Sequence, residues 1–170
     1  PDIAHSVRGE YPVHFLNDDW HYSFASARSR ESVNPRPVEF HTLHRLYSHY
    51  TIGSVSYSEG VHDDLNKMVW SLLEFNADYP LREAVSDYVR YFFFGADTEK
   101  LTDCIFGLEK NWEGNPQNNP SINATYKSFC ELKCDYPALS KNWRFLLLYF
   151  RACCDKLVLD RIKFENSLLE

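Results

Sequence analysis

The fold is decided by residues 51–70, TIGSVSYSEGVHDDLNKMVW. Residues 52–57 are small, β-branched or aromatic with one glycine among them, which is typical of a buried strand that its neighbours approach closely. From Val61 the apolar residues recur at the spacing of one helical face: Val61, Leu65, Met68, Val69, Leu72 and Leu73. The stretch therefore predicts a short strand, a polar tip at residues 58–60 and an amphipathic helix.

The polar tip puts Glu59 at the expected carboxyl end of this strand. Ligands and catalytic groups collect there in α/β proteins, because the strand aims side chains into a crevice lined by the following loops. Four further polar or aromatic residues crowd the same spot: Tyr57, Ser58, His62 and Asp63. The alternative is structural, since a negative charge at a helix start is stabilised by ~0.3–1 kcal/mol.

A second candidate strand is PDIAHSV at residues 1–7, followed by a polar tip at residues 8–10. If both strands belong to one parallel sheet, His5, Arg8 and Glu59 share its carboxyl edge and form one cleft. Cleavage of a glycosidic bond needs a second carboxyl group ~5–9.5 Å from the first. Glu10 and Asp63 are the candidates for that second group. The alternative for Arg8 and Glu10 is a surface ion pair that contributes little to stability.

The remainder of the chain predicts helices. They are expected over residues 38–49, from Asp78 or Pro80 to Gly95, from Thr98, over residues 122–134, and from Ser140 toward Leu169. In the last helix the expected inward-facing residues are Trp143, Leu146, Leu147, Phe150, Cys153 and Leu157. The fold class predicted is mainly α with a minor parallel β part: closing βα units in residues 1–76 and an all-helical domain in residues 77–170.

Two strands are too few for a stable parallel sheet, which must be covered on both faces. The chain opens on Pro1 rather than Met. We therefore expect the strands to pair with the remaining part of a larger chain, which would be the chain's main protein partner.

The composition and the motifs of the chain argue against several classes of function. The 170 residues are 44% hydrophobic and 25% charged, ordinary values for a globular protein. A formal net charge of −6 without a run of Lys and Arg argues against nucleic-acid binding. The longest apolar run is far shorter than the ~20 residues of a membrane span. No phosphate loop, dinucleotide fingerprint or nucleophile elbow is present, so we expect no cofactor.

The cysteines and histidines predict no metal site. Five cysteines, with Cys153 and Cys154 adjacent, favour free thiols in a reducing compartment, which favours the cytoplasm as the location. Cys130 and Cys134 lie four residues apart on an expected helix, but no second pair of ligands has suitable spacing. His41 and His44 share a helical face without a carboxylate, so we expect both to be exposed to solvent.

Three segments resemble a known class of proteins: SVSYSEGVHDDLNK at residues 54–67, LREAVSDYVRYFFFG at residues 81–95, and GLEKNWEGN at residues 107–115. They resemble the C-terminal region of large bacterial proteins with a glycosidase-like (β/α) barrel, in which the last strand and helix lead into a helical domain. DIAHSVRGEYPV and SVNPRP are similar to the stretch before that last strand. The resemblance covers roughly residues 1–130.

The resemblance implies hydrolysis of glycosides, with pocket residues Glu59, His62, Asp63 and Asp64 at one strand tip and His5 and Arg8 at the other. We predict Glu59 and Asp63 as catalytic residues, and His5, Arg8, Glu10, Tyr57, His62 and Asp64 as residues that bind the carbohydrate substrate. The leading hypothesis is the C-terminal portion of a carbohydrate-active hydrolase. The alternatives are a helical interaction or scaffold module without chemistry and, third, a metal-dependent hydrolase using His5, Glu59, His62 and Asp63.

Overall fold

The computed structural model describes residues 33–56 and 63–169. Within these ranges the regular elements are helices. The α-helices are α2 (Pro37–Tyr47), α3 (Asp64–Phe75), α4 (Leu81–Phe92), α5 (Thr98–Lys110), α6 (Pro120–Asp135) and α7 (Trp143–Ser167). Short 3₁₀ helices are η1 (Ser48–Tyr50), η3 (Pro116–Asn118) and η4 (Pro137–Lys141).

The predicted parallel β part is wrong, because the described residues contain no strand and fold as an all-helical structure. Residues 52–56 are irregular and exposed, with Ile52 and Val55 facing solvent. Two features explain the error. Gly53 has a φ of 144°, which breaks an extended path. Ile52 and Val55 are three residues apart, so a strand would place them on opposite faces. Tyr57 and the candidate strand at residues 1–7 lie outside the described residues.

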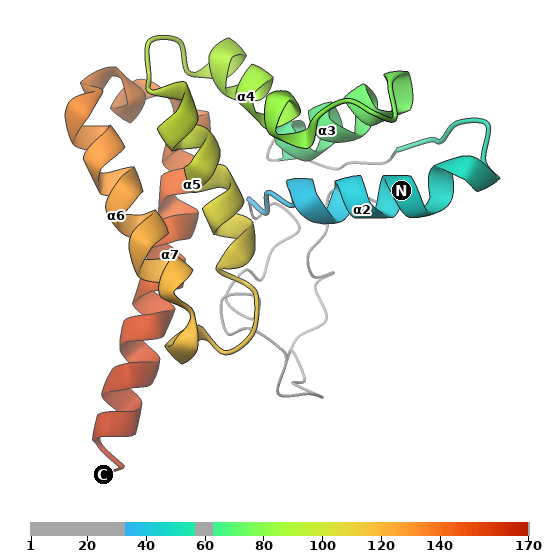
Figure 1. Ribbon diagram of the computed structural model, residues 1–170. Helices are drawn as coiled ribbons and strands as arrows, with labels where there is room; N and C mark the ends of the chain where they lie inside the picture. The colour runs from blue at the N-terminus through green and yellow to red at the C-terminus, as the bar shows by residue number, and fades with distance from the viewer. Residues whose placement is uncertain (1–32, 57–62, 170) are drawn as a thin grey trace.

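The helices form two groups (Figure 1). Helices α5, α6 and α7 lie side by side, and each runs opposite to the one before it. Helices α2, α3 and α4 form the second group, and contacts of α4 and α2 with α5 join it to the first. The C-terminal part of α7 extends beyond α5 and α6. None of the described helices combines the length and the apolar character needed to cross a lipid bilayer.

Helix ends follow local signals in the sequence. Pro80 precedes α4 and Gly95 follows it with a φ of 84°, a backbone conformation that glycine adopts without strain. The Asp97 side chain accepts a hydrogen bond from the Lys100 N–H and so caps α5. Asn142 caps α7 by accepting from the backbone N–H groups of Arg144 and Phe145. These boundaries agree with the helices predicted from Pro80 and Thr98.

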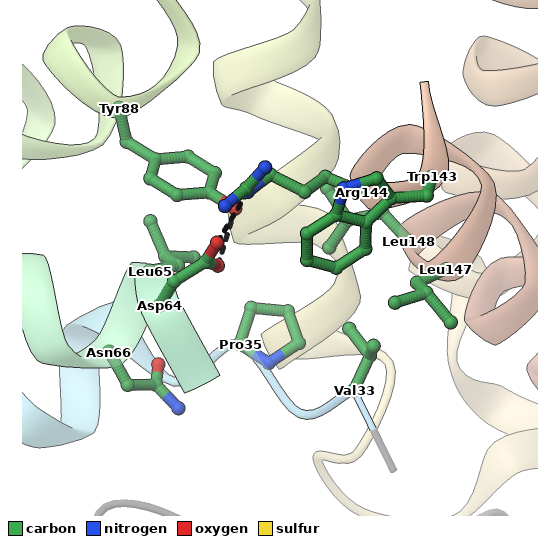
Figure 2. A pocket seen from close by; sticks show the side chains of 10 residues that line it. All are labelled: Val33, Pro35, Asp64, Leu65, Asn66, Tyr88, Trp143, Arg144, Leu147 and Leu148. Atoms are coloured by element: carbon green, nitrogen blue, oxygen red, sulfur yellow. Dashed lines mark hydrogen bonds and ion pairs between the residues drawn. The ribbon is translucent and has the colours of Figure 1, made fainter. Parts of the chain in front are cut away.

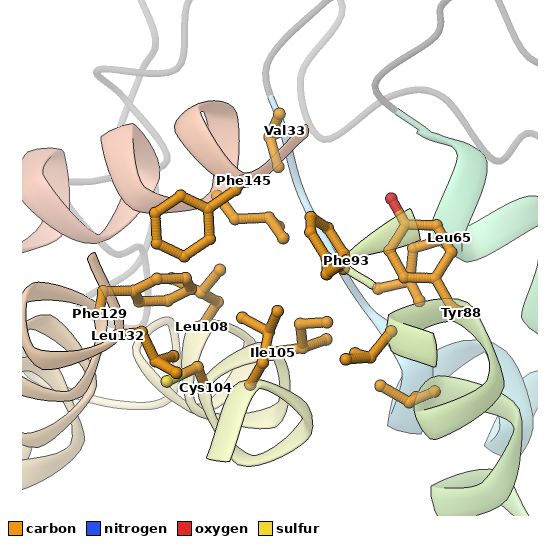
Figure 3. Packing of buried hydrophobic residues seen from close by; sticks show 14 of the residues in the cluster. Val33, Leu65, Tyr88, Phe93, Cys104, Ile105, Leu108, Phe129, Leu132 and Phe145 are labelled. Atoms are coloured by element: carbon orange, nitrogen blue, oxygen red, sulfur yellow. The ribbon is translucent and has the colours of Figure 1, made fainter. Parts of the chain in front are cut away.

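One main hydrophobic core runs through both groups of helices (Figure 3). Its fully buried side chains come from α3 to α7: Val69, Leu73, Val85, Val89, Leu101, Ile105, Leu108, Phe129, Leu132 and Phe145. The rings of Phe129 and Phe145 pack with centroids 5.8 Å apart. Residues on both sides of residue 76 contribute to this core, while the division of the chain into units 1–76 and 77–170 stays a prediction.

Helix α7 turns a different face to the core from the one predicted. Of the residues expected inside, Trp143, Leu146, Phe150 and Leu157 are exposed. The buried positions are Phe145, Leu148, Arg151, Ala152, Asp155, Leu159 and Ile162. The helix carries apolar residues on two opposite sides, so periodicity alone does not select the inner one.

Two long-range contacts fix how the helices meet. The Glu109 carboxylate of α5 accepts hydrogen bonds from the backbone N–H groups of Val38 (2.8 Å) and Glu39 (2.9 Å), which open α2. It thereby satisfies donors that have no partner within a helix. Gly107 allows α6 to approach α5 closely, because a Cβ at this position would lie 2.2 Å from the Thr125 Oγ1.

Candidate functional site

The structure describes two of the eight predicted site residues, Asp63 and Asp64, at the start of α3. The other six lie outside the described residues: His5, Arg8, Glu10, Tyr57, Glu59 and His62. The pairing of Glu59 with Asp63 or Glu10 as catalytic carboxylates therefore stays a prediction. The geometry of the two described aspartates indicates what this end of α3 does.

Asp63 occupies the N-cap position of α3 and is only 3% exposed. Its side chain makes no capping hydrogen bond to the first turn. Its charge nevertheless lies at the positive end of the helix dipole, which favours an anion there. At this degree of burial, Asp63 offers almost no surface to a bound sugar.

Asp64 is the centre of an interaction between three helices (Figure 2). The Tyr88 hydroxyl of α4 donates to its Oδ1 at 2.7 Å, and the Arg144 Nε of α7 donates to its Oδ2 at 2.5 Å. The Arg144 guanidinium also lies over the rings of Phe92 and Trp143, 3.9 and 4.2 Å from their centroids. Both carboxylate oxygens of Asp64 are thus engaged by protein donors.

The electrostatics of this cluster keep Tyr88 as a neutral donor. Burial, and then the negative charge of Asp64, raise the pKa of the Tyr88 hydroxyl well above its usual value. A phenol that does not ionise near neutral pH donates its hydrogen bond to Asp64 throughout the physiological range. The cluster therefore holds α3, α4 and α7 together as a fixed polar contact.

The cavity beside Asp64 is too small for a sugar. It is lined by residues of α3, α4, α7 and the segment before α2: Val33, Pro35, Asp64, Leu65, Asn66, Tyr88, Trp143, Arg144, Leu147 and Leu148. Its volume of about 10 Å³ is close to the least that holds one water molecule. Sites for small ligands are usually ~300–1,000 Å³.

A second polar cluster holds the segment that leads toward the predicted tip. The Ser54 hydroxyl donates to Glu74 Oε1 at 2.8 Å and accepts from Trp70 Nε1 at 2.9 Å. His44 Nε2 lies 3.7 Å from the same Glu74 oxygen. The irregular segment at residues 51–56 is therefore tied to the middle and end of α3, with Trp70 serving as a packing residue.

His44 is buried, which corrects the expectation that both α2 histidines face solvent. Its ring packs edge to face on Trp70, with centroids 5.2 Å apart, and Phe40 also packs edge to face on the same indole, with centroids 6.1 Å apart. Its Nδ1 has no hydrogen-bond partner in the described part of the chain. His44 thus fills space between α2 and α3, a role that the helical spacing alone did not indicate.

Sequence reasoning missed a buried ion pair in α7. Arg151 Nε donates to Asp155 Oδ1 at 2.9 Å, and both side chains are almost completely buried. Asp155 also accepts from Asn111 Nδ2 (2.9 Å) and Trp112 Nε1 (3.2 Å), and the guanidinium lies 3.6 Å from the Trp112 ring centroid. Burial lowers the pKa of Arg151, and the Asp155 carboxylate opposes this shift.

The remaining hydrogen bonds of Arg151 go to two main-chain oxygens and to the Asn34 side chain, whose Oδ1 accepts from Nη1 at 3.4 Å. Its Nη1 donates to the Val33 carbonyl at 3.2 Å and its Nη2 to the Leu108 carbonyl at 3.3 Å. Arg151 therefore links α7 to the end of α5 and to the segment before α2. The signal for this network was present in the sequence, as two charges four residues apart in the apolar run LLLYFRACCDKLVL.

No other described cluster resembles a catalytic or metal centre. Among residues 33–56 and 63–169, no group of three or more His, Cys, Asp or Glu side chains could hold a metal ion. The five cysteines are free thiols. An open groove of about 560 Å³ runs between α5 and α6, and Gly107, Ser121, Ala124 and Thr125 give part of its lining small side chains.

Comparison of the chain with protein-family models, with curated proteins and with solved structures found no match.

Proposed function

We propose that the described helical part of the chain is an interaction module without reaction chemistry of its own. The observation that carries this proposal is the state of Asp64: its two oxygens accept hydrogen bonds from Tyr88 and Arg144 beside a cavity of about 10 Å³. A carboxylate held in this way joins helices, and the cavity beside it is too small for a sugar ring.

The exposed surface of the described residues supports binding to another protein. Isolated exposed apolar residues are ordinary, but contiguous apolar patches usually mark interaction sites. Exposed large apolar side chains gather at the end of α2 and the following segment, and along α7. They include Leu46, Tyr47, Tyr50, Ile52 and Val55 in the first region, and Leu146, Phe150, Leu157 and Phe164 in the second.

Asp64→Asn in the full-length protein tests the proposal. The substitution removes the charge that pairs with Arg144, and we expect the free energy of unfolding to fall by about 1–3 kcal/mol. Turnover of aryl glycosides per folded molecule should equal that of the wild type, whatever its level. Asp78→Asn changes an exposed aspartate and should leave both quantities unchanged. A selective loss of turnover at an unchanged unfolding midpoint would place Asp64 in a catalytic site and contradict the proposal.

A carbohydrate-hydrolase role for a larger chain is a second proposal. It rests on the sequence resemblance and on the anchoring of residues 51–56 by Ser54, which fixes the start of the segment leading to Glu59. Glu59→Gln in the full-length protein tests it through aryl-glycoside turnover. Unchanged turnover would remove Glu59 from the catalytic site.

A further inference from the structure

Helix α7 has an apolar face that points away from the core. Trp143, Phe150, Leu157 and Phe164 follow one another at intervals of seven residues, and Leu146 lies between the first two. Their exposed fractions are 43%, 65%, 67%, 64% and 38%, respectively. We call these five residues the α7 stripe.

The α7 stripe has the spacing of one of the two apolar positions in a coiled-coil heptad, and Leu146 supplies the second position in the first heptad. Apolar residues repeated every seven positions stay on one side of a helix and face a second helix in a coiled coil. Phe145, Leu148, Ala152 and Leu159 lie on the opposite side and are buried in the protein. A helix that is apolar on both sides is stable in water when both sides are covered.

The charges beside the α7 stripe are balanced within the helix itself. Lys156 pairs with Asp160 and Arg161 pairs with Glu165, each at a spacing of four residues. Two identical faces of this kind meet without a net repulsion between rows of like charge. A strongly acidic or strongly basic partner would gain little from such a surface.

The area of the α7 stripe suits a small dimer interface. A helix of 25 residues is about 37 Å long. Aromatic side chains have ~150–250 Å² of surface, so five large side chains exposed by roughly half offer about 500 Å². With the flanking parts of the same helix, this approaches the ~800 Å² that each partner buries in an interface of standard size.

We propose that the α7 stripe pairs with the α7 stripe of a second copy of this chain. The proposal deepens the proposed function, on which it rests, because it names the partner of the interaction module. The projecting C-terminal part of α7 gives the second copy access beyond the ends of α5 and α6 (Figure 1).

Sedimentation velocity on the full-length protein tests the pairing. We expect a dimer for the wild type at micromolar concentration. The double variant Phe150→Glu/Leu157→Glu should be monomeric, because four carboxylates would be buried in one interface. Its far-UV circular dichroism and its unfolding midpoint should match those of the wild type measured at a concentration low enough to dissociate the dimer. Phe94→Glu, which alters a residue 97% exposed outside α7, is the matched control and should stay dimeric.

Three outcomes would overturn the pairing: a wild-type monomer up to about 100 μM, a double variant that stays dimeric, or a Phe94→Glu variant that dissociates equally. If the double variant unfolds, Phe164→Glu near the projecting end replaces it and should weaken the dimer at least about tenfold. A monomeric wild type, together with an Asp64→Asn variant that is destabilised but keeps the turnover of the wild type, would reject the pairing while leaving the interaction module in place.

Discussion

Asp155 is the buried charge on which the packing of α7 depends. It accepts hydrogen bonds from Arg151, Asn111 and Trp112, and it is completely buried. Asp155→Asn would leave the Arg151 guanidinium buried without a counter-charge, so we expect a loss of about 3–5 kcal/mol in the free energy of unfolding. Urea denaturation measures it. Glu165→Gln, which alters an exposed pair on the same helix, should cost no more than about 0.5 kcal/mol; similar costs for both variants would contradict this role.

Glu109 should make stability depend on pH. Burial raises the pKa of its carboxyl group in the folded protein, although hydrogen bonds from Val38 and Glu39 oppose the shift. The folded state therefore takes up this proton more readily than the unfolded state. The resulting stabilisation is fully present below the ordinary pKa of 4.5 and is lost as the pH rises through the raised folded value.

The comparison with Glu109→Gln isolates this contribution. On acidification from about pH 7 to about pH 5, the wild type should gain stability relative to the variant, which has no proton to take up. Chemical denaturation at each pH measures the difference. A difference that is constant with pH, or one that favours the variant at lower pH, would show that the folded pKa is not raised.

At the scale of single elements, Gly107 sets the distance between α5 and α6. Helix propensity alone favours Ala over Gly by about 1 kcal/mol. The added Cβ, however, would lie 2.2 Å from Thr125 Oγ1, and overpacking of this kind costs about 1–3 kcal/mol. We expect Gly107→Ala to lower the thermal unfolding midpoint and Gly107→Ala/Thr125→Ala to restore part of it. A stabilised single variant would mean that the helices separate without cost.

Some features of the helices could be predicted from the sequence and others could not. The boundaries of α4 and the start of α5 could be predicted because Pro80 and Gly95 act through local backbone geometry and a polar side chain caps α5, although the capping residue is Asp97 and not Thr98. The inward face of α7 was not, because apolar residues lie on both of its sides. The strand at residues 52–57 was inferred from composition, while its apolar residues lacked the alternation that a half-buried strand requires.

The contacts at the candidate site join residues that are far apart in the sequence. That Asp64 opens a helix could be predicted, since acidic residues favour the first turn. Its partner Arg144 lies 80 residues further along the chain, and no local pattern connects the two. The buried pair of Arg151 and Asp155 had a visible spacing, but its burial follows from the packing of α5 against α7.

At the scale of the whole molecule, the described chain is a set of six helices around one main core, with polar contacts at Asp64 and Asp155 that lock α7 onto the others. Residues 52–56, which the sequence suggested as part of a barrel strand, form an irregular segment tied to α3 by Ser54. The described part of the chain is therefore an all-helical module and contains no rim of a parallel sheet.

Hydrogen exchange measured by mass spectrometry on the full-length protein tests this claim most directly. The amides of residues 52–56 should exchange as fast as those of an exposed loop, because the segment is irregular and its side chains face solvent. The amides of α5, at the centre of the core, should exchange slowest. Protection of residues 52–56 equal to that of α5 would show a hydrogen-bonded strand there and contradict the helical account.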